Sequence, residues 1–98
     1  MEHAAAHAPK YLPAKLRAIR KTYGTSQRWM ARLILVECHH HISEYERGLR
    51  IPSLVTILYY SRIAGIPLES IADDDLDLEC FTRQLRQAER SRGDLNQP

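Results

Sequence analysis

The sequence QRWMARLILVECHHHISEYERG occupies residues 27–48 and predicts two short helices joined by a tight turn. The first helix has an apolar stripe made of Met30, Ala31 and Ile34. The second helix has a stripe with the helical spacing i, i+3, i+4, i+7, which consists of Cys38, His41, Ile42 and Tyr45. Because the two stripes lie so close together in the chain, both helices are expected to bury them in one shared core.

The opposite side of the second predicted helix is polar and has no packing role. It consists of His39, His40, Ser43, Glu44 and Arg47. These side chains supply hydrogen-bond donors and acceptors, which a helix needs in order to read base edges in a DNA groove. The alternative is an ordinary solvated helix surface.

Charge is distributed unevenly along the chain. Residues 3–36 contain seven Lys and Arg and no acid, whereas residues 63–82 contain six Asp and Glu and no Lys or Arg. The basic end suits a polyanion, and a solvated charged face is the alternative. For the run Asp73 to Asp75, a solvated acidic end is favoured over a metal site, because three adjacent residues on regular backbone cannot all point one way.

Length and cysteine content limit the class of protein. A chain of 98 residues is expected to form one domain. Cys38 and Cys80 have no CxxC spacing, so neither a disulfide framework nor a cysteine zinc site is indicated. No leader and no membrane span is recognised, and a cytoplasmic location without membrane contact is expected.

Capping residues divide the chain into a mobile N-terminal arm at 1–10, a domain of five helices at 11–78, and a short C-terminal helix or tail at 79–98. Ser26 is a predicted N-cap, and Gly24, Gly48 and Gly65 are placed to end helices. The predicted fold class is therefore all-α.

The first helix of the domain is predicted at residues 13–23. Its polar side carries Lys15, Arg17 and Lys21, with Arg20 a candidate for the same side. All of these cations are expected to be available to solvent or phosphate.

Three segments then occur in a recognisable order: KLRAIRKTYGTSQ, ISEYERGLRIPSL and AGIPLESI. Together they resemble the Xre family of helix-turn-helix DNA-binding proteins, which includes phage repressors and Cro, over residues 12–77. The resemblance implies a five-helix phage-repressor-like fold. It implies phosphate contacts at Gln27, Arg28, Arg47 and Arg50. It also implies that His39, His40, Ser43 and Glu44 face base edges and that Arg20 forms an ion pair with Glu46.

The turn between the two helices departs from the family pattern. One residue more than usual separates Ala31 from Ile42, and Leu35 stands where the family usually has Gly. We therefore expect Leu35 to extend the first helix, with Val36 and Glu37 making the bend.

The expected function is sequence-specific binding of double-stranded DNA, as a transcriptional repressor that occupies an operator. Two short helices make a small footprint, so a homodimer that reads two half-sites about 34 Å apart is expected. No cofactor is expected. An enzyme is disfavoured because the chain has no Gly-rich phosphate loop, no paired catalytic carboxylates and no nucleophile beside a base.

Two rival functions remain open. One is a protein-interaction module of antitoxin or adaptor type, in which an edge formed by Trp29 and Leu33 and the acidic end of the domain bind a partner. That edge is otherwise a wider buried face or a contact between chains, and stacking of Trp29 on a base is the remaining alternative. The other is a metal sensor built on Cys38 and the histidines at 39–41. Only Cys38 with His41, or one histidine with Glu37 or Glu44, could share an ion on a helix.

Overall fold

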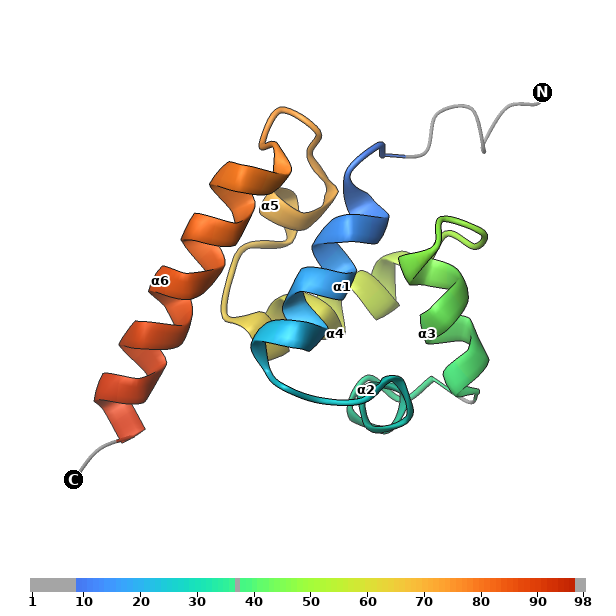
Figure 1. Ribbon diagram of the computed structural model, residues 1–98, viewed down its shortest axis with the longest axis horizontal. Coiled ribbons are helices and arrows are strands. Elements are labelled where there is room, and N and C mark those ends of the chain that lie inside the picture. The colour runs from blue at the N-terminus through green and yellow to red at the C-terminus, as the bar shows by residue number, and fades with distance from the viewer. Residues whose placement is uncertain (1–8, 37, 97–98) are drawn as a thin grey trace.

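The computed structural model describes residues 9–36 and 38–96, with side chains described as far as residue 91, and within this part the chain forms six α-helices and no strand. The helices are α1 (Leu12–Thr22), α2 (Gln27–Leu33), α3 (His39–Glu46), α4 (Leu54–Ala64), α5 (Leu68–Ala72) and α6 (Leu78–Asn96). α1 runs through the middle of the molecule, with α2 and α3 to one side of it and α6 to the other (Figure 1). The all-α fold class is confirmed. Most of the expected mobile arm at 1–10 lies outside the described residues.

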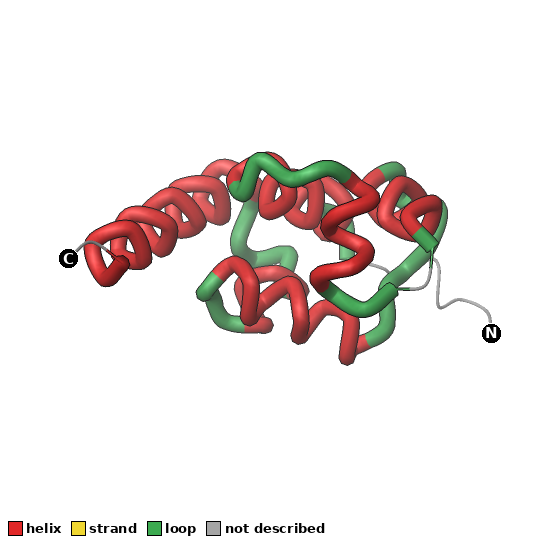
Figure 2. The backbone as a smooth tube through the Cα atoms, turned by 90° about the horizontal axis from the view of Figure 1, so that it is seen from below, coloured by secondary structure: helices red, strands yellow, loops and turns green. Residues whose placement is uncertain are grey.

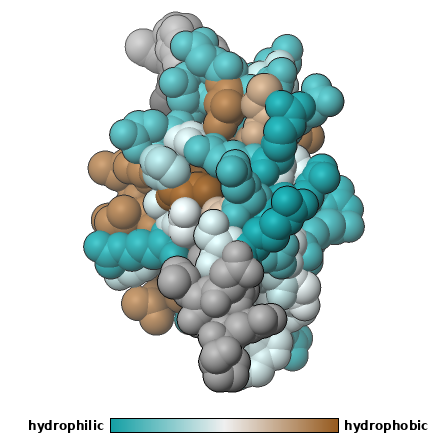
Figure 3. All heavy atoms as spheres, turned by 90° about the vertical axis from the view of Figure 1, so that its left-hand side faces the viewer, coloured by the Kyte–Doolittle hydropathy of each residue, from teal (hydrophilic) through white to brown (hydrophobic). Residues whose placement is uncertain are grey.

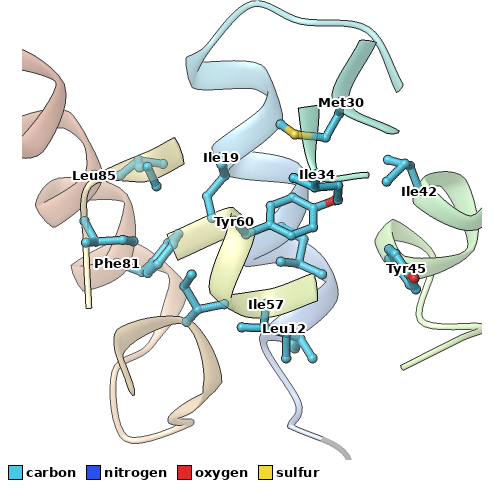
Figure 4. Close-up of a cluster of buried hydrophobic side chains, with 14 of the residues drawn as sticks. Leu12, Ile19, Met30, Ile34, Ile42, Tyr45, Ile57, Tyr60, Phe81 and Leu85 are labelled. Atoms are coloured by element: carbon cyan, nitrogen blue, oxygen red, sulfur yellow. The ribbon is translucent and has the colours of Figure 1, made fainter. Parts of the chain in front are cut away.

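All six helices contribute side chains to one hydrophobic core. The ring of Tyr60 from α4 lies at its centre, between Ile19 and Ile34 (Figure 4). The stripes predicted on α2 and α3 are buried at Met30, Ala31, Ile34, Ile42 and Tyr45, while Cys38 and His41 are half-buried. The expectation that both helices share one core is therefore confirmed.

The expected short C-terminal helix is in fact the longest helix, with 19 residues in α6. Phe81 is 0% exposed and Leu85 is 1% exposed, and both belong to the same core as α1 and α4. The last turns of α6 extend past the other helices (Figures 1 and 2). The face that carries α6 is mostly hydrophilic, with scattered hydrophobic side chains (Figure 3). The first part of α6 thus completes the core, and the rest projects from it. None of the described helices is both long enough and apolar enough to cross a membrane.

Helix ends follow the predicted capping residues. Gly24, Gly48 and Gly65 all have left-handed backbone, with φ of 66°, 75° and 70°. After α3, the Gly48 N–H donates to the Tyr45 carbonyl and the Leu49 N–H to the Glu44 carbonyl, which closes the helix end. At the start of α2, the Ser26 hydroxyl accepts a hydrogen bond from the Trp29 N–H at 3.1 Å, as an N-cap does. Glycine is suited to the left-handed ends because it has no Cβ to clash.

The end of α2 has the same geometry without a glycine. α2 ends at Leu33, and Leu35 has a φ of 60°. The Leu35 N–H donates to the Arg32 carbonyl at 3.3 Å and the Val36 N–H to the Ala31 carbonyl at 2.8 Å. Our expectation that Leu35 extends the helix is therefore wrong. Val36 is partly buried against the core, and the backbone turns toward it in the left-handed region although the residue is leucine. Glu37, which we expected in the bend, lies outside the described residues.

We expect Leu35→Gly to raise the free energy of unfolding by about 0.5 to 1 kcal/mol, because left-handed backbone costs a leucine about 1–2 kcal/mol and the greater freedom of glycine in the unfolded chain cancels part of this. The Leu35 side chain is 74% exposed, so its removal loses little packing. Urea denaturation measures the change. Leu33→Gly is the matched control: this residue is exposed too but has helical backbone, so glycine should cost stability there. An equal loss of stability in both variants would show that the backbone at Leu35 is not strained.

The expected position of Lys15 is also wrong. Lys15 was expected on the polar side of α1, but its side chain is 0% exposed. Its Nζ donates to the Ser70 carbonyl at 2.9 Å and the Asp73 carbonyl at 2.8 Å, and lies 5.3 Å from the centre of the Phe81 ring. A positive charge thus satisfies the last carbonyls of α5, where the helix dipole favours a cation. Burial lowers the pKa of Lys15, against the attraction of the neighbouring Asp74, Asp73 and Asp77.

Two carboxylates of the acidic segment after α5 accept hydrogen bonds from backbone N–H groups beside or within other helices. Asp74 accepts hydrogen bonds from the backbone N–H groups of Lys10 at 2.8 Å and Tyr11 at 3.1 Å, at the start of α1. Asp77 Oδ1 accepts one from the Cys80 N–H at 2.9 Å, at the start of α6. These backbone hydrogen bonds lower the pKa of Asp74 and of Asp77. Asp77 therefore caps the N-terminus of α6, where negative charge is stabilised, and Asp74 holds the backbone just before α1.

Candidate nucleic-acid interface

α3 presents the polar face predicted for it. His40 and Arg47 are exposed, and His39, Ser43 and Glu44 are half-buried. Ile42 and Tyr45 anchor the opposite side of the helix in the core. Five side chains with donors and acceptors therefore share the outer side of one short helix, which we call the polar face of α3.

The ion pair implied by the family resemblance is present. Arg20 Nε donates to Glu46 Oε2 at 2.6 Å, and Arg20 Nη2 donates to Glu46 Oε1 at 3.0 Å. Gln27 Nε2 donates to the same Oε1 at 3.2 Å, and Arg20 Nη1 donates to the Thr25 carbonyl at 3.0 Å. The Glu46 side chain is only 4% exposed. The pair therefore connects α1, the start of α2 and the end of α3. Gln27, which was expected at a phosphate, uses one of its N–H groups to bond Glu46.

The cations at the end of α3 already contact neighbours on the polar face. Arg50 Nε donates to Glu44 Oε1 at 2.7 Å, and both side chains are partly exposed. Arg47 Nε donates to the Ser43 Oγ at 3.2 Å. The Arg50 hydrogen bond lowers the pKa of Glu44. Two expected phosphate contacts are thus joined to two expected base-facing residues.

Two histidine rings lie side by side at the start of α3. The rings of His39 and His40 are 4.3 Å apart between centroids and tilted by 36°. Partial burial lowers the pKa of His39, and repulsion by His40 and by Arg28 on α2 lowers it further. Arg28 therefore lies near enough to His39 to affect its charge. The structure brings this expected phosphate contact toward the expected base-facing histidines.

The edge of α2 is apolar and exposed. Trp29 is 58% exposed and Leu33 is 51% exposed, and the exposed Leu35 follows them. The Arg32 guanidinium lies 5.2 Å from the centre of the Trp29 ring. A wider buried face within the protomer, one of the readings of this edge, is therefore wrong. A contact with another chain stays an expectation.

The structure does not gather the residues of the metal-sensor alternative into a ligand set. Among the described residues, no three His, Cys, Asp or Glu side chains lie together as metal ligands would. Glu37, one of the residues weighed as a ligand, lies outside that part of the chain.

A cavity lies between α1, α2 and α3 that the sequence did not predict. Its volume is about 230 Å³, and its walls are Arg17, Arg20, Gln27, Ser43, Glu46 and Arg47. Arg17 was expected only as one of several exposed cations. The available signal was its spacing of three residues from Arg20, which places both on one side of a helix. That spacing does not reveal that Arg47 lines the same cavity.

Comparison with models of known protein families, with curated proteins and with solved structures finds no match to this chain.

Proposed function

We propose that this protein binds double-stranded DNA sequence-specifically and acts as a transcriptional repressor that occupies an operator. The observation that carries the proposal is the polar face of α3, which presents donors and acceptors between Arg28 at one end and Arg47 and Arg50 at the other. The resemblance to the Xre helix-turn-helix family supports the same function.

The dimensions of α3 suit the major groove. Eight residues at 1.5 Å each give a helix about 12 Å long, and a helix about 10–12 Å across fits a groove about 12 Å wide. In this arrangement His39, His40, Ser43 and Glu44 face base edges. Gln27, Arg28, Arg47 and Arg50 lie along the phosphates, and the buried pair of Arg20 with Glu46 fixes the angle of α3.

We expect Arg28→Ala to weaken binding to all duplexes about equally, because a phosphate contact positions the protein without reading sequence. The slope of log affinity against log salt should fall by about one unit for the lost contact. Fluorescence anisotropy with several duplexes across a salt series measures both effects. Arg86→Ala, on α6 at the other side of α1, removes the same charge away from the polar face and should leave the slope unchanged. A changed sequence preference with an unchanged slope would show that α2 does not lie along the backbone.

Binding should tighten as pH falls from about 8 to about 6. In the free protein the pKa of His39 is lowered, whereas nearby phosphates would raise it in the complex, so binding takes up protons. The affinity should rise up to about tenfold for each histidine whose pKa rises by one unit. Anisotropy at fixed salt and varied pH tests this with the wild type, the His39→Gln/His40→Gln double variant and a chain lacking residues 1–8. The double variant could keep the dependence of affinity on pH while the chain lacking residues 1–8 loses it. That result would place the polar face of α3 away from DNA.

A second candidate function is a protein-interaction module, which the exposed edge of Trp29, Leu33 and Leu35 favours. An apolar edge of this kind suits a second protein chain better than it suits phosphate. A homodimer on two half-sites would place such a contact within the DNA-binding function itself. Salt-sensitive binding to random duplex DNA would argue against the adaptor alternative.

A further inference from the structure

The cavity between α1, α2 and α3 has more cations than anions in its wall. Three of its wall residues are the cations Arg17, Arg20 and Arg47, and only one, Glu46, is an anion. Because Glu46 is paired with Arg20 at 2.6 Å, the charges of Arg17 and Arg47 are left without a counter-charge in the cavity wall. A site of this composition favours an anion.

The donors that face the cavity divide into those already used and those still free. The Glu46 carboxylate accepts three hydrogen bonds from Arg20 and Gln27, so its negative charge is already balanced within the wall. Arg17 is exposed and has no hydrogen bond or ion pair with the described residues. Arg47 uses its Nε on Ser43, which leaves its two terminal nitrogens as donors. The Ser43 hydroxyl accepts from Arg47 and can therefore direct its own proton at a ligand.

We propose that this cavity is an oxyanion site that takes one phosphate of the DNA backbone. Arg17 and Arg47 hold it from two sides, and the Ser43 hydroxyl donates a third hydrogen bond. Guanidinium groups match phosphate oxygens because their N–H groups form a planar fork. The proposal rests on the proposed function, and it adds Arg17 of α1 to the DNA contacts.

A phosphodiester fits this cavity better than a small free metabolite does. The cavity opens beside the polar face of α3, with which it shares Ser43 and Arg47. A helix lying in the major groove has phosphates along both of its sides. The Arg20–Glu46 pair forms one wall of the cavity, so a phosphate held there would rest against a fixed surface.

The first experiment uses inorganic phosphate alone. Side-chain Nε–Hε NMR signals of arginine are followed while phosphate replaces chloride at constant ionic strength. We expect saturable shifts at Arg17 and Arg47 in the wild type, and their loss at Arg47 in Arg17→Gln. Because the Arg17 side chain is exposed and has no hydrogen bond or ion pair with the described residues, this variant should keep the wild-type melting temperature, which a thermal melt checks. Unshifted signals at both arginines would overturn the oxyanion site.

The second experiment uses duplex DNA. Arg17→Gln should lower the salt slope by about one unit and the affinity about fivefold at 0.15 M salt, whereas Arg86→Gln on α6 should change neither. Neutral methylphosphonates, introduced one at a time, then identify the phosphate. At the contacted position Arg17→Gln should cause no further loss, because the two changes remove the same interaction.

The outcomes separate the two proposals. If the wild type binds duplex and Arg17→Gln keeps the full slope, the cavity proposal is wrong and the proposed function stands. If the wild type binds no duplex, the proposed function is wrong, and so is a backbone phosphate as the occupant, whatever free phosphate does.

Discussion

Glu46→Ala should lower the free energy of unfolding by about 3 kcal/mol, the loss expected when one partner of a buried ion pair is removed. The Glu46 side chain is 4% exposed, and its carboxylate accepts hydrogen bonds from both Arg20 and Gln27. The alanine therefore leaves the Arg20 guanidinium in a partly buried place without its counter-charge. Urea denaturation measures the loss, and duplex binding should weaken as well because α3 loses its attachment to α1.

The matched control is Glu44→Ala on the same helix. Glu44 also pairs with an arginine, with 2.7 Å between Arg50 Nε and Glu44 Oε1, but both side chains are partly exposed. Exposed pairs contribute little, so this variant should keep nearly the wild-type stability. Equal melting temperatures for the two variants would show that the Arg20–Glu46 pair does not support the fold.

Lys15→Ala should also lower the free energy of unfolding by about 3 kcal/mol or more. The change leaves the carbonyls of Ser70 and Asp73 without their donor, and it opens a space beside Phe81 in the core. Since domains of this kind are stable by about 5–15 kcal/mol, much of the margin would be lost. Chemical denaturation measures it.

Lys15→Met separates the two causes of that loss. Methionine fills similar space without the hydrogen bonds, so this variant should recover the packing part and keep the cost of unpaired carbonyls. Arg17→Ala removes a cation from the same helix at an exposed place, and should leave stability unchanged. A Lys15→Ala protein as stable as Arg17→Ala would contradict a buried role for Lys15.

The sequence by itself determined the first five helices and the capped ends of several of them, but not the length of α6 or the end of α2. Apolar residues at helical spacing placed Met30, Ile34, Ile42 and Tyr45 in the core, because periodicity is a local property that burial then uses. Glycines and serines placed the caps for the same reason. The polar face of α3 could be predicted because it consists of the residues that do not belong to the buried stripe.

The tertiary structure decided what local pattern does not contain. Lys15 looks like a surface cation, and only the end of α5, 55 residues away, turns it into a buried cap. Leu35 takes a backbone conformation suited to glycine because the core needs Val36 at that point. Arg17 and Arg47 share a cavity because α1 and α3 pack against each other. For Lys15 and for the pair of Arg17 and Arg47 the deciding contact joins segments distant in the chain, and for Leu35 burial of the next residue outweighs a local preference of about 1–2 kcal/mol.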